Sequence, residues 1–468
     1  MYREKIEAYF EKNKQRMLDD ICRVLRIDSV AHRGGEPPMP YGQGVHDALC
    51  EAEKIARELG LRVRPCDGHA ITVTASDKPD ELALLAHLDV VPVGKGWKYP
   101  PFDGTIEDGK IYGRGSADDK GPAIVSLYAL AAAAEINPNM SKGARVILGG
   151  AEEIGSPDIA YYQTKEKMPP YSFSPDADYP IINIEKGHFG LTFGNEWAEE
   201  KDLPRLVELK GGTIGNAVPQ EASALLEGMG EGLLADLCKK HSKQSGVQFK
   251  IEKEGVCFRV TALGESAHAS TPDLGVNAQT ALVELLADMP LAESECRKNI
   301  KALARLFPHG DNHGKALGID ISDEVSGRLT LAFSMLEFTK TGFTGSFDSR
   351  VCVSGNEQNV GDVAVAAIER EGIKIPSRKP MSPPHHTPEE LPFVQTLKRV
   401  YEQYTGQKGE CVAIGGGTYV HSIEGGVAFG CSMPGTDNRM HGVDEFAVID
   451  ELMISAKMFT QVILDMCE

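Results

Sequence analysis

The chain has 468 residues, of which 41% are hydrophobic and 25% are charged, a composition typical of a soluble globular protein and not of a collagen, a coiled coil or a disordered chain. Lys and Arg total 49 against 68 Asp and Glu, and the formal net charge of −19 argues against binding to nucleic acid or to an anionic membrane.

The ten cysteines are scattered without a tight framework, so we expect reduced thiols. The charged N-terminal segment does not resemble a signal peptide, and no run of about 18 apolar residues predicts a membrane helix. We therefore expect a cytoplasmic protein.

The first part of the chain alternates predicted helices and strands. Apolar residues at helical spacing predict an amphipathic helix over the first thirty residues, and a second helix follows at about 45–59. Further along, the pattern predicts strands and one helix, namely strands at 71–76, 81–91 and 144–153 and a helix at 121–136. This alternation indicates an α/β layered sheet.

The pattern changes near residue 187. Glycine-rich strand candidates, a helix near 277–289 and a hairpin-like stretch over 327–353 predict a separate α+β domain. A proline-rich stretch at 376–392 has the composition of a linker, and two more helices follow it. We therefore predict one domain made of residues 1–186 and 381–468, with a second domain, residues 187–380, inserted into it.

Acidic and imidazole side chains stand at the ends of the predicted buried strands, where open α/β sheets present their ligand sites. They form four groups and one late histidine: His87 with Asp89, Asp118 with Asp119, Glu152 with Glu153, Asp176 with Asp178, and His441.

The spacing within these groups suggests that the two residues of a pair have different roles. His87 and Asp89 are two residues apart on a strand, so one can bind a metal while the other holds the imidazole in the correct tautomer. The adjacent Glu152 and Glu153 point in different directions, which allows one free base and one metal ligand. Two close cations need a bridging carboxylate and mixed nitrogen and oxygen ligands, so the set predicts a two-metal hydrolase. Spacing alone does not separate Asp176 from Asp178, and the alternative interpretation of Asp119 is a turn or helix-capping carboxylate.

The motifs HLDVVP, GRGSADDKGP, EEIGS, SPDADYP and MHGVDE occur in this order, together with GGTIGNAVPQEA, SAHASTPDLGVNA, FDSR and GGGTY. This pattern resembles the cocatalytic dizinc metallopeptidases that include carnosinase, aminoacylase and bacterial glutamate carboxypeptidase, and within them the peptidase V group of dipeptidases. The resemblance extends from about residue 10 to the C-terminus. It implies a three-layer, zinc aminopeptidase-like α/β catalytic domain with an inserted α+β lid domain.

The resemblance also implies roles for the acidic cluster. His87 and Asp176 are expected as terminal metal ligands, Glu153 and His441 complete the set, and Asp118 bridges two ions. Asp118 is preferred over Asp119 because it holds the acidic place of the family's acidic-any-Lys-Gly motif, and Asp176 is preferred because it belongs to the PDA motif. The expected cofactor is two Zn²⁺ per chain, although this ligand type also accepts Mn²⁺ or Co²⁺. Glu152 is expected to act as the general base, and Asp89 to orient His87.

Other residues match the family's substrate-contacting positions. His268 resembles the lid histidine that stabilises the oxyanion, and Arg350 could grip a substrate α-carboxylate bidentately. The middle place of the FDSR motif departs mildly from most relatives, because Ser349 stands where they carry an apolar residue. Further substrate contacts are expected at Asn216, Gly415, Gly416 and Gly417. The alternative interpretation of His268 is a surface or strand histidine without a role in catalysis. The alternative interpretation of Arg350 is a surface salt bridge.

The leading hypothesis is a metal-dependent dipeptidase that acts on small peptides as a monomer. One alternative is an amidohydrolase, a deacylase or desuccinylase, acting on N-acyl amino acids through nearly the same site. Another is a noncatalytic metal-binding protein, which the presence of Asp89 and Glu152 argues against, because neither residue is needed to hold metals.

Overall fold

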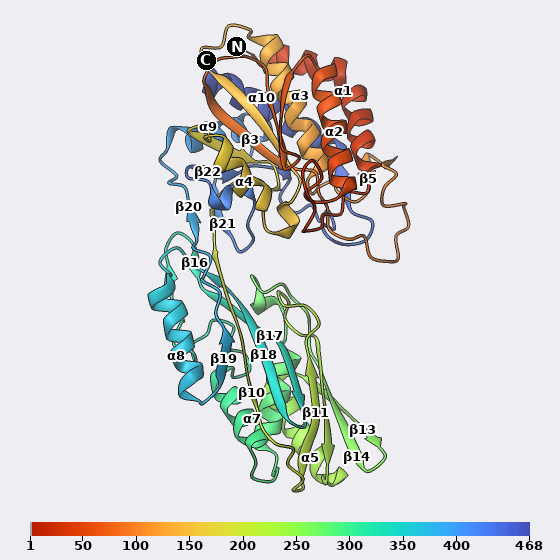
Figure 1. The fold of residues 1–468 in the computed structure, drawn as a ribbon, viewed down its shortest axis with the longest axis vertical. Coiled ribbons are helices and arrows are strands. Elements are labelled where there is room, and N and C mark those ends of the chain that lie inside the picture. Colours follow the sequence, from red (N-terminus) through yellow and green to blue (C-terminus); the bar gives the residue numbers. More distant parts are fainter. Residues whose placement is uncertain (1) are drawn as a thin grey trace. The chain divides into compact units, whose positions relative to one another are not determined.

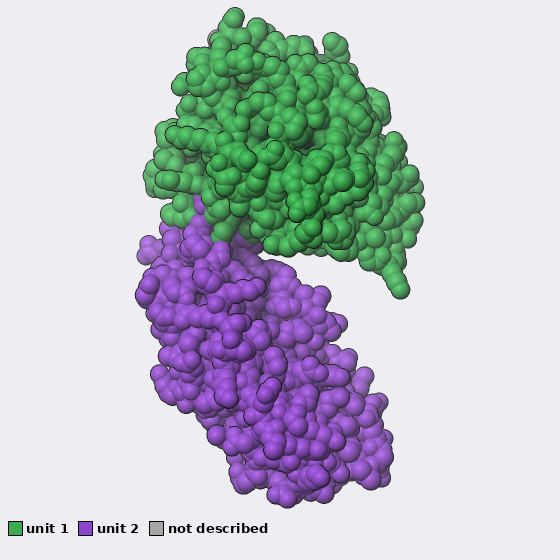
Figure 2. Space-filling view, in the orientation of Figure 1, with its two compact units in different colours: residues 1–184, 386–412, 417–468 green, residues 185–385, 413–416 purple. Residues whose placement is uncertain are grey.

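The computed structural model describes residues 2–468, which form two compact units (Figures 1 and 2). Unit 1 comprises the residues up to 184 together with 386–412 and 417–468, and unit 2 comprises 185–385 together with 413–416. Among the helices of residues 2–468, none combines the length and apolar character needed to span a bilayer.

Unit 1 is built around a mixed β-sheet with the strand order β1-β2-β6-β3-β7-β22-β9-β20. Strand β20 is His385–His386, and β21 (Cys411–Ile414) also pairs with β9. Strand β3 runs parallel to both β6 and β7, whereas β1 and β2 pair antiparallel at one side. The strands on this path are β1 (Arg62–Cys66), β2 (Ala70–Thr74), β3 (Asp80–His87), β6 (Gly143–Gly149), β7 (Tyr171–Ser174), β9 (Ile181–Glu185) and β22 (Gly426–Ala428). Shorter pairings involve β4 (Thr105–Glu107), β5 (Lys110–Tyr112), β8 (Ala177–Asp178), β23 (Cys431–Ser432) and β24 (Phe446–Val448).

Helices cover both faces of this sheet. Side chains alternate along β3, so that Leu82 and Leu84 join the large core cluster of one face, whereas Ala83 and Leu85 join a smaller cluster on the other. The large cluster takes in α1 (Arg3–Leu25), α2 (Gln43–Glu58), α3 (Lys120–Ile136), α9 (Pro392–Thr405) and α10 (Ile449–Cys467), and the smaller one takes in α4 (Pro157–Lys165) and the 3₁₀ turn Tyr419–Ser422. The result is the expected three-layer arrangement.

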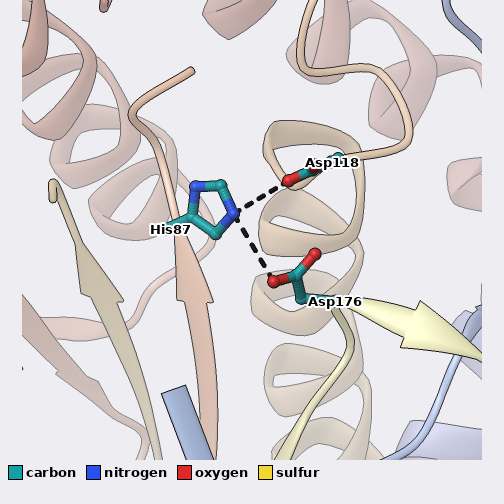
Figure 3. Close-up of side chains that lie close together, drawn as sticks. All are labelled: His87, Asp118 and Asp176. Carbon is teal, nitrogen blue, oxygen red and sulfur yellow. Dashed lines mark ion pairs between the residues drawn. The ribbon is translucent and has the colours of Figure 1, made fainter. Parts of the chain in front are cut away.

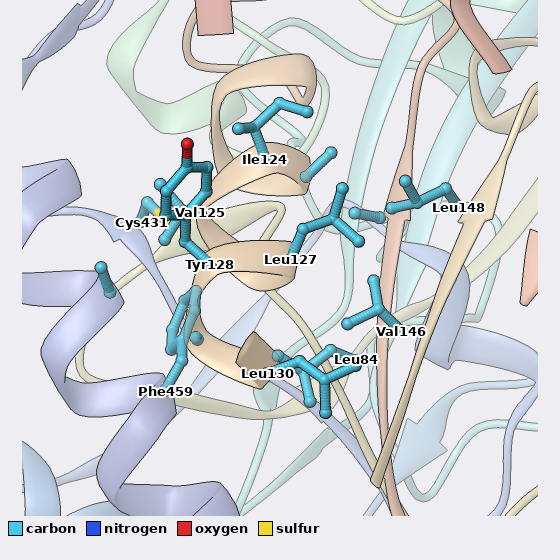
Figure 4. Packing of buried hydrophobic residues seen from close by; sticks show 14 of the residues in the cluster. Leu84, Ile124, Val125, Leu127, Tyr128, Leu130, Val146, Leu148, Cys431 and Phe459 are labelled. Atoms are coloured by element: carbon cyan, nitrogen blue, oxygen red, sulfur yellow. The ribbon is translucent and has the colours of Figure 1, made fainter. Parts of the chain in front are cut away.

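Helix α3 is the central helix of the large cluster. It packs on β3 and β6 and also against α1 and α10, so it is apolar on nearly every side. Figure 4 shows Leu127 and Leu130 facing Leu84 and Val146 of the strands, and Tyr128 close to Phe459 of α10. The N-terminus of α3 is thereby fixed beside the end of β3.

Unit 2 contains an antiparallel sheet of eight strands with helices on one face. The strand order is β13-β14-β12-β11-β17-β18-β10-β19, with β10 (Gly187–Glu196), β11 (Arg205–Gly211), β12 (Glu221–Glu227), β13 (Gln248–Glu254), β14 (Cys257–Leu263), β17 (Thr330–Thr339), β18 (Gly342–Val351) and β19 (Lys374–Ser377). A separate core cluster joins this sheet to α5 (Glu231–Ser245), α6 (Ala278–Asp288), α7 (Glu295–Leu306) and α8 (Asp362–Arg370). The predicted α/β fold with an inserted α+β domain is confirmed.

Two predicted strands are shorter than expected. The strand predicted at 81–91 ends at His87, and the one predicted at 144–153 ends at Gly149. Residues Glu152–Ile154 form a 3₁₀ turn instead, because the backbone N–H groups of Glu152 and Glu153 are taken by the Asp89 carboxylate and not by a neighbouring strand. The acidic residues therefore lie in the turns that follow the strands.

Candidate metal and substrate site

The imidazole of His87 is the centre of a first group of possible ligands. His87 is the last residue of β3 and is fully buried. Its Nε2 lies 2.9 Å from Oδ1 of Asp118 and 3.6 Å from Oδ2 of Asp176. Figure 3 shows both carboxylates pointing toward this nitrogen, one from the start of α3 and the other from the turn after β7.

A second group shares Asp118 with the first. Oδ2 of Asp118 lies 3.0 Å from Nε2 of His441, and this nitrogen lies 3.2 Å from Oε1 of Glu153. Glu153 belongs to the 3₁₀ turn after β6, whereas His441 comes from the loop before β24. Asp118 thus turns one oxygen to each group, which is the arrangement of a carboxylate between two cations.

The spacing of these atoms suits bound metal ions. Ligand atoms 2.0–2.1 Å from a tetrahedral zinc ion lie about 3.3 Å from one another, and the separations in the two groups range from 2.9 to 3.6 Å. Within the described part of the chain, the buried Nε2 of His87 and Oε1 of Glu153 have no hydrogen-bond partner. Ligand atoms that lie close together without bonding to each other are what a cation between them requires. The five side chains therefore fit two metal ions.

Asp89 connects the two groups without belonging to either. One carboxylate oxygen accepts the backbone N–H of Glu152 and the other that of Glu153, both at 3.1 Å. Oδ1 also lies 3.3 Å from Nδ1 of His87, and the Asp89 backbone oxygen lies 3.0 Å from the same nitrogen. Asp89 thus fixes both the ring of His87 and the turn that carries the two glutamates.

The structure separates the pairs that spacing left open. Asp119 occupies the N-cap position of α3, but its side chain caps no helix N–H. Its Oδ2 instead accepts the backbone N–H of His87 at 3.0 Å, so the helix-capping alternative is wrong. Asp178 is exposed in β8, whereas Asp176 faces His87.

Crowding of negative charge shifts the titration of the buried groups. Burial raises the pKa of Asp176 to about 7, and the charge of Asp118 adds to the effect. Burial also raises the pKa of Glu152 well above its usual range, with contributions from Asp176, Glu153 and Asp118. Burial alone lowers the pKa of His87, but the carboxylates of Asp118, Asp176 and Asp89 reverse this and raise it well above its usual range. Nearby carboxylates favour a positive charge at this place, whether a proton or a metal ion supplies it.

Sequence reasoning missed the pair Asp158 and Tyr419. The Asp158 carboxylate accepts the backbone N–H groups of Gly150 and Ala151, at 2.7 and 2.9 Å, and the hydroxyl of Tyr419. The Tyr419 ring also meets the His87 ring edge-on at 6.1 Å. The motif GGGTY contains Tyr419, but nothing in the sequence pairs it with a residue more than 250 positions earlier.

In unit 2, Arg350 is held by a carboxylate and a carbonyl. Its Nε and Nη2 donate to the two oxygens of Asp348 at 2.8 and 3.1 Å, and its Nη1 donates to the carbonyl of Gly415. His188 lies opposite Arg350 on β10, with its Nε2 2.9 Å from Asp348. The side-on pairing leaves the Nη1–Nη2 edge of the guanidinium oriented away from Asp348.

Ser270 lies between His268 and Gly415 and is close to both. Nδ1 of His268 lies 2.7 Å from the Ser270 hydroxyl and accepts the Ser270 backbone N–H at 3.2 Å. A neutral imidazole that accepts at Nδ1 carries its hydrogen on Nε2. A Cβ on Gly415 would lie only 2.3 Å from Cβ of Ser270, so this position requires glycine.

The other predicted substrate residues divide between the units. The backbone oxygen of Asn216 accepts the Ala269 N–H at 2.9 Å, which brings Asn216 beside His268. Gly416 belongs to unit 2 with Gly415, whereas Gly417 is exposed in unit 1.

Comparison with known proteins identifies the family. The model of peptidase family M20/M25/M40 matches residues 83–465. A Bacillus subtilis (strain 168) protein named "Putative dipeptidase YtjP" is 34% identical over 465 residues, with 98% of each chain covered. The Beta-Ala-Xaa dipeptidase of Lactobacillus delbrueckii subsp. lactis is 32% identical over 468 residues, with 97% of each chain covered. The crystal structure of human carnosine dipeptidase 1 matches with a TM-score of 0.61 and 16% identity, covering 100% of this chain and 99% of that one, which shows a shared fold. The resemblance read from the motifs is confirmed: this chain is a hydrolase that belongs to peptidase family M20/M25/M40.

Proposed function

We propose that the chain is a dinuclear metal-dependent dipeptidase that splits a dipeptide into its two amino acids. The observation that supports this most is the position of Asp118, whose two oxygens belong to two different groups of possible ligands. The names of the two sequence relatives, both dipeptidases, support the substrate class.

The proposed ligands divide into a shared residue and two pairs. Asp118 would bridge the ions, His87 and Asp176 would complete one site, and Glu153 and His441 would complete the other. We propose Zn²⁺ at both sites, with Mn²⁺ or Co²⁺ as alternatives that imidazole and carboxylate ligands accept. Unit 1 is then the catalytic domain and unit 2 the lid domain.

Two bound divalent ions polarise a carbonyl group and lower the pKa of water to about 7. In the proposed reaction, the Glu152 carboxylate takes the proton from the attacking water and later delivers it to the leaving amine. The backbone hydrogen bond from Glu152 to Asp89 supports this role, because it fixes the start of the turn that carries the base. Asp89 also holds the ring of His87, so one carboxylate aligns a base and a ligand.

Unit 2 supplies the proposed substrate contacts except Gly417, which belongs to unit 1. The Nη1–Nη2 edge of Arg350 can bind the C-terminal carboxylate of a dipeptide end-on, because Asp348 occupies the other edge. His268 donates from Nε2 to the substrate carbonyl oxygen as negative charge develops there. Asn216, Gly415, Gly416 and Gly417 are kept as further proposed contacts. We further propose a cytoplasmic monomer that binds small peptides. The net charge of −19 argues against nucleic acid as a partner.

The test is amino-acid release by chelator-stripped protein that has been reloaded with zinc, manganese or cobalt. Dipeptides, tripeptides and N-acetyl amino acids are assayed in parallel, with Glu152→Gln as the inactive control. We expect metal-restored turnover of dipeptides. Turnover of acylated amino acids alone would contradict the proposal and identify a deacylase. The absence of turnover with every substrate would identify a noncatalytic protein.

A further inference from the structure

A buried ion pair in unit 1 lies beside the acidic cluster but has no place in the predicted site. Arg114 and Glu445 are 1% and 0% exposed in their side chains, and Nη1 of Arg114 donates to Oε2 of Glu445. A buried ion pair is by itself weak evidence of stabilisation, because desolvation offsets much of the attraction. What distinguishes this pair is the set of backbone groups that it binds.

Each residue of the pair binds the segment that carries the other. Oε1 of Glu445 accepts the backbone N–H groups of Gly115, Ala117 and Asp118, at 3.0, 3.1 and 3.3 Å. In return, Nη2 of Arg114 donates to the backbone oxygens of His441 and Gly442, at 3.1 and 3.0 Å. The bonds therefore join the Asp118 loop directly to the His441 loop.

The His441 loop needs such support. The His441 side chain is 56% exposed, so packing alone does not hold it. Arg439, His441 and Asp444 all adopt positive φ angles, of 56°, 61° and 56°, which residues other than glycine adopt only at a cost in free energy. A second anchor exists, since Asp444 accepts the backbone N–H groups of Lys98 and Tyr99, but it does not connect the loop to the segment of Asp118, as Arg114 and Glu445 do.

We propose that Arg114 and Glu445 are positioning residues that set the separation of Asp118 and His441, and thereby the affinity for the metal ion held by Asp118, Glu153 and His441. This inference rests on the proposed metal site. The ion of the other group depends less on the pair, because no hydrogen bond or ion pair within residues 2–468 joins His87 or Asp176 to either residue. These two ligands are placed by β3 and by the turn after β7. Loss of a partner that orients ligands typically lowers metal affinity about 10- to 100-fold.

The experiment measures zinc binding by the chelator-stripped full-length chain, in competition with a chromophoric chelator, for the wild type, Glu445→Gln and Arg114→Lys. Arg114→Lys keeps the buried charges balanced but removes the guanidinium group that binds Glu445 and the His441 loop at the same time. This variant tests the inference if Glu445→Gln does not fold. The matched control is Arg145→Lys, which weakens a partly buried ion pair of unit 1: Nε of Arg145 lies 2.7 Å from Asp80 at the opposite end of β3.

We expect two zinc ions per wild-type chain and, in Glu445→Gln, an affinity for one ion that is about 10- to 100-fold weaker. Arg114→Lys should show a smaller loss of the same kind. Arg145→Lys should lower the unfolding temperature without changing either zinc affinity. Unchanged zinc affinity in folded Glu445→Gln or Arg114→Lys, or an equal loss in Arg145→Lys, would overturn the inference while leaving the dipeptidase proposal intact. A wild-type chain that binds no zinc pair would refute the proposed function itself.

Discussion

The candidate residues of the two units differ in charge, burial and support. Those of unit 1 are mostly carboxylates that are buried or half-buried, and two of their atoms, on His87 and Glu153, lack a hydrogen-bond partner among the described residues. In unit 2, Arg350 already has Asp348 and Gly415 as partners, and His268 has Ser270. The first set is incomplete without added positive charge, whereas the second already has partners and contains the cationic guanidinium of Arg350. Unit 1 is therefore suited to cations, and unit 2 to the oxygen atoms of a substrate.

Replacement of the proposed base should give the largest effect. Glu152→Gln keeps the size and the backbone hydrogen bond to Asp89 but cannot accept the proton, so kcat should fall about 10²- to 10⁴-fold. Zinc content, measured by elemental analysis, should stay at the wild-type value. Full turnover would remove Glu152 from the mechanism, and a loss of zinc would make it a ligand instead.

Removal of the metal ions should destabilise unit 1 and leave the stability of unit 2 unchanged. The crowded carboxylates of unit 1 repel one another, and each ion present at about a thousand times its dissociation constant would stabilise the fold by about 4 kcal/mol. Hydrogen exchange after chelation should rise in the segments around His87, Asp118 and Glu153 and stay unchanged in β10 and β18. An equal increase in hydrogen exchange in both units would contradict the claim that only unit 1 needs the metal ions.

Arg350→Met should act on substrate binding. The loss of a charged, two-bond contact should raise KM about 10- to 100-fold for dipeptides with a free carboxylate, with a smaller change in kcat. The same dipeptides with a C-terminal amide provide the control, because they lack the group that Arg350 binds. An equal rise in KM for both substrate types would mean that the variant has only disturbed β18.

Ser270→Ala should give a smaller effect through His268. The variant loses the hydroxyl contact to Nδ1 but keeps the backbone N–H at 3.2 Å. We expect about a fivefold fall in kcat/KM, corresponding to about 1 kcal/mol. Nitrogen-15 NMR of labelled histidine should show a smaller fraction of the Nε2–H tautomer, and an unchanged tautomer population would exclude this role for Ser270.

The smallest effect is expected outside both sets, at Asp323 of the hairpin β15 (Ser322–Asp323) and β16 (Gly327–Arg328). Burial opposes ionisation there, but hydrogen bonds from Ser326 and Ser354 prevail and lower the pKa of Asp323 to about 2. A lowered pKa stabilises the fold above the usual value near 4, and this contribution is lost as the pH falls toward 2. Asp323→Asn should therefore cost about 1 kcal/mol of unfolding free energy at pH 7 and less at pH 3, with kcat/KM unchanged. A cost that does not shrink on acidification would show that the charge plays no part.

The sequence predicted the parts of the site that depend on local pattern. Strand alternation predicted that His87 and Asp89 lie together, and the family's acidic-any-Lys-Gly and PDA motifs indicated Asp118 and Asp176 ahead of their acidic neighbours. It could not predict contacts between distant segments, such as Glu445 with the Asp118 loop or Asp158 with Tyr419, because tertiary packing decides them. It also extended the strand that ends at His87 to residue 91, since the apolar run HLDVV does not show where the ladder breaks.

The most direct test is anomalous diffraction at the zinc edge from crystals of the zinc-loaded full-length chain. We expect two peaks about 3.5–4 Å apart, one on each side of the Asp118 carboxylate, with His87 at one and His441 at the other. A single peak, or peaks that do not share Asp118, would contradict the dinuclear site in which this carboxylate bridges the ions.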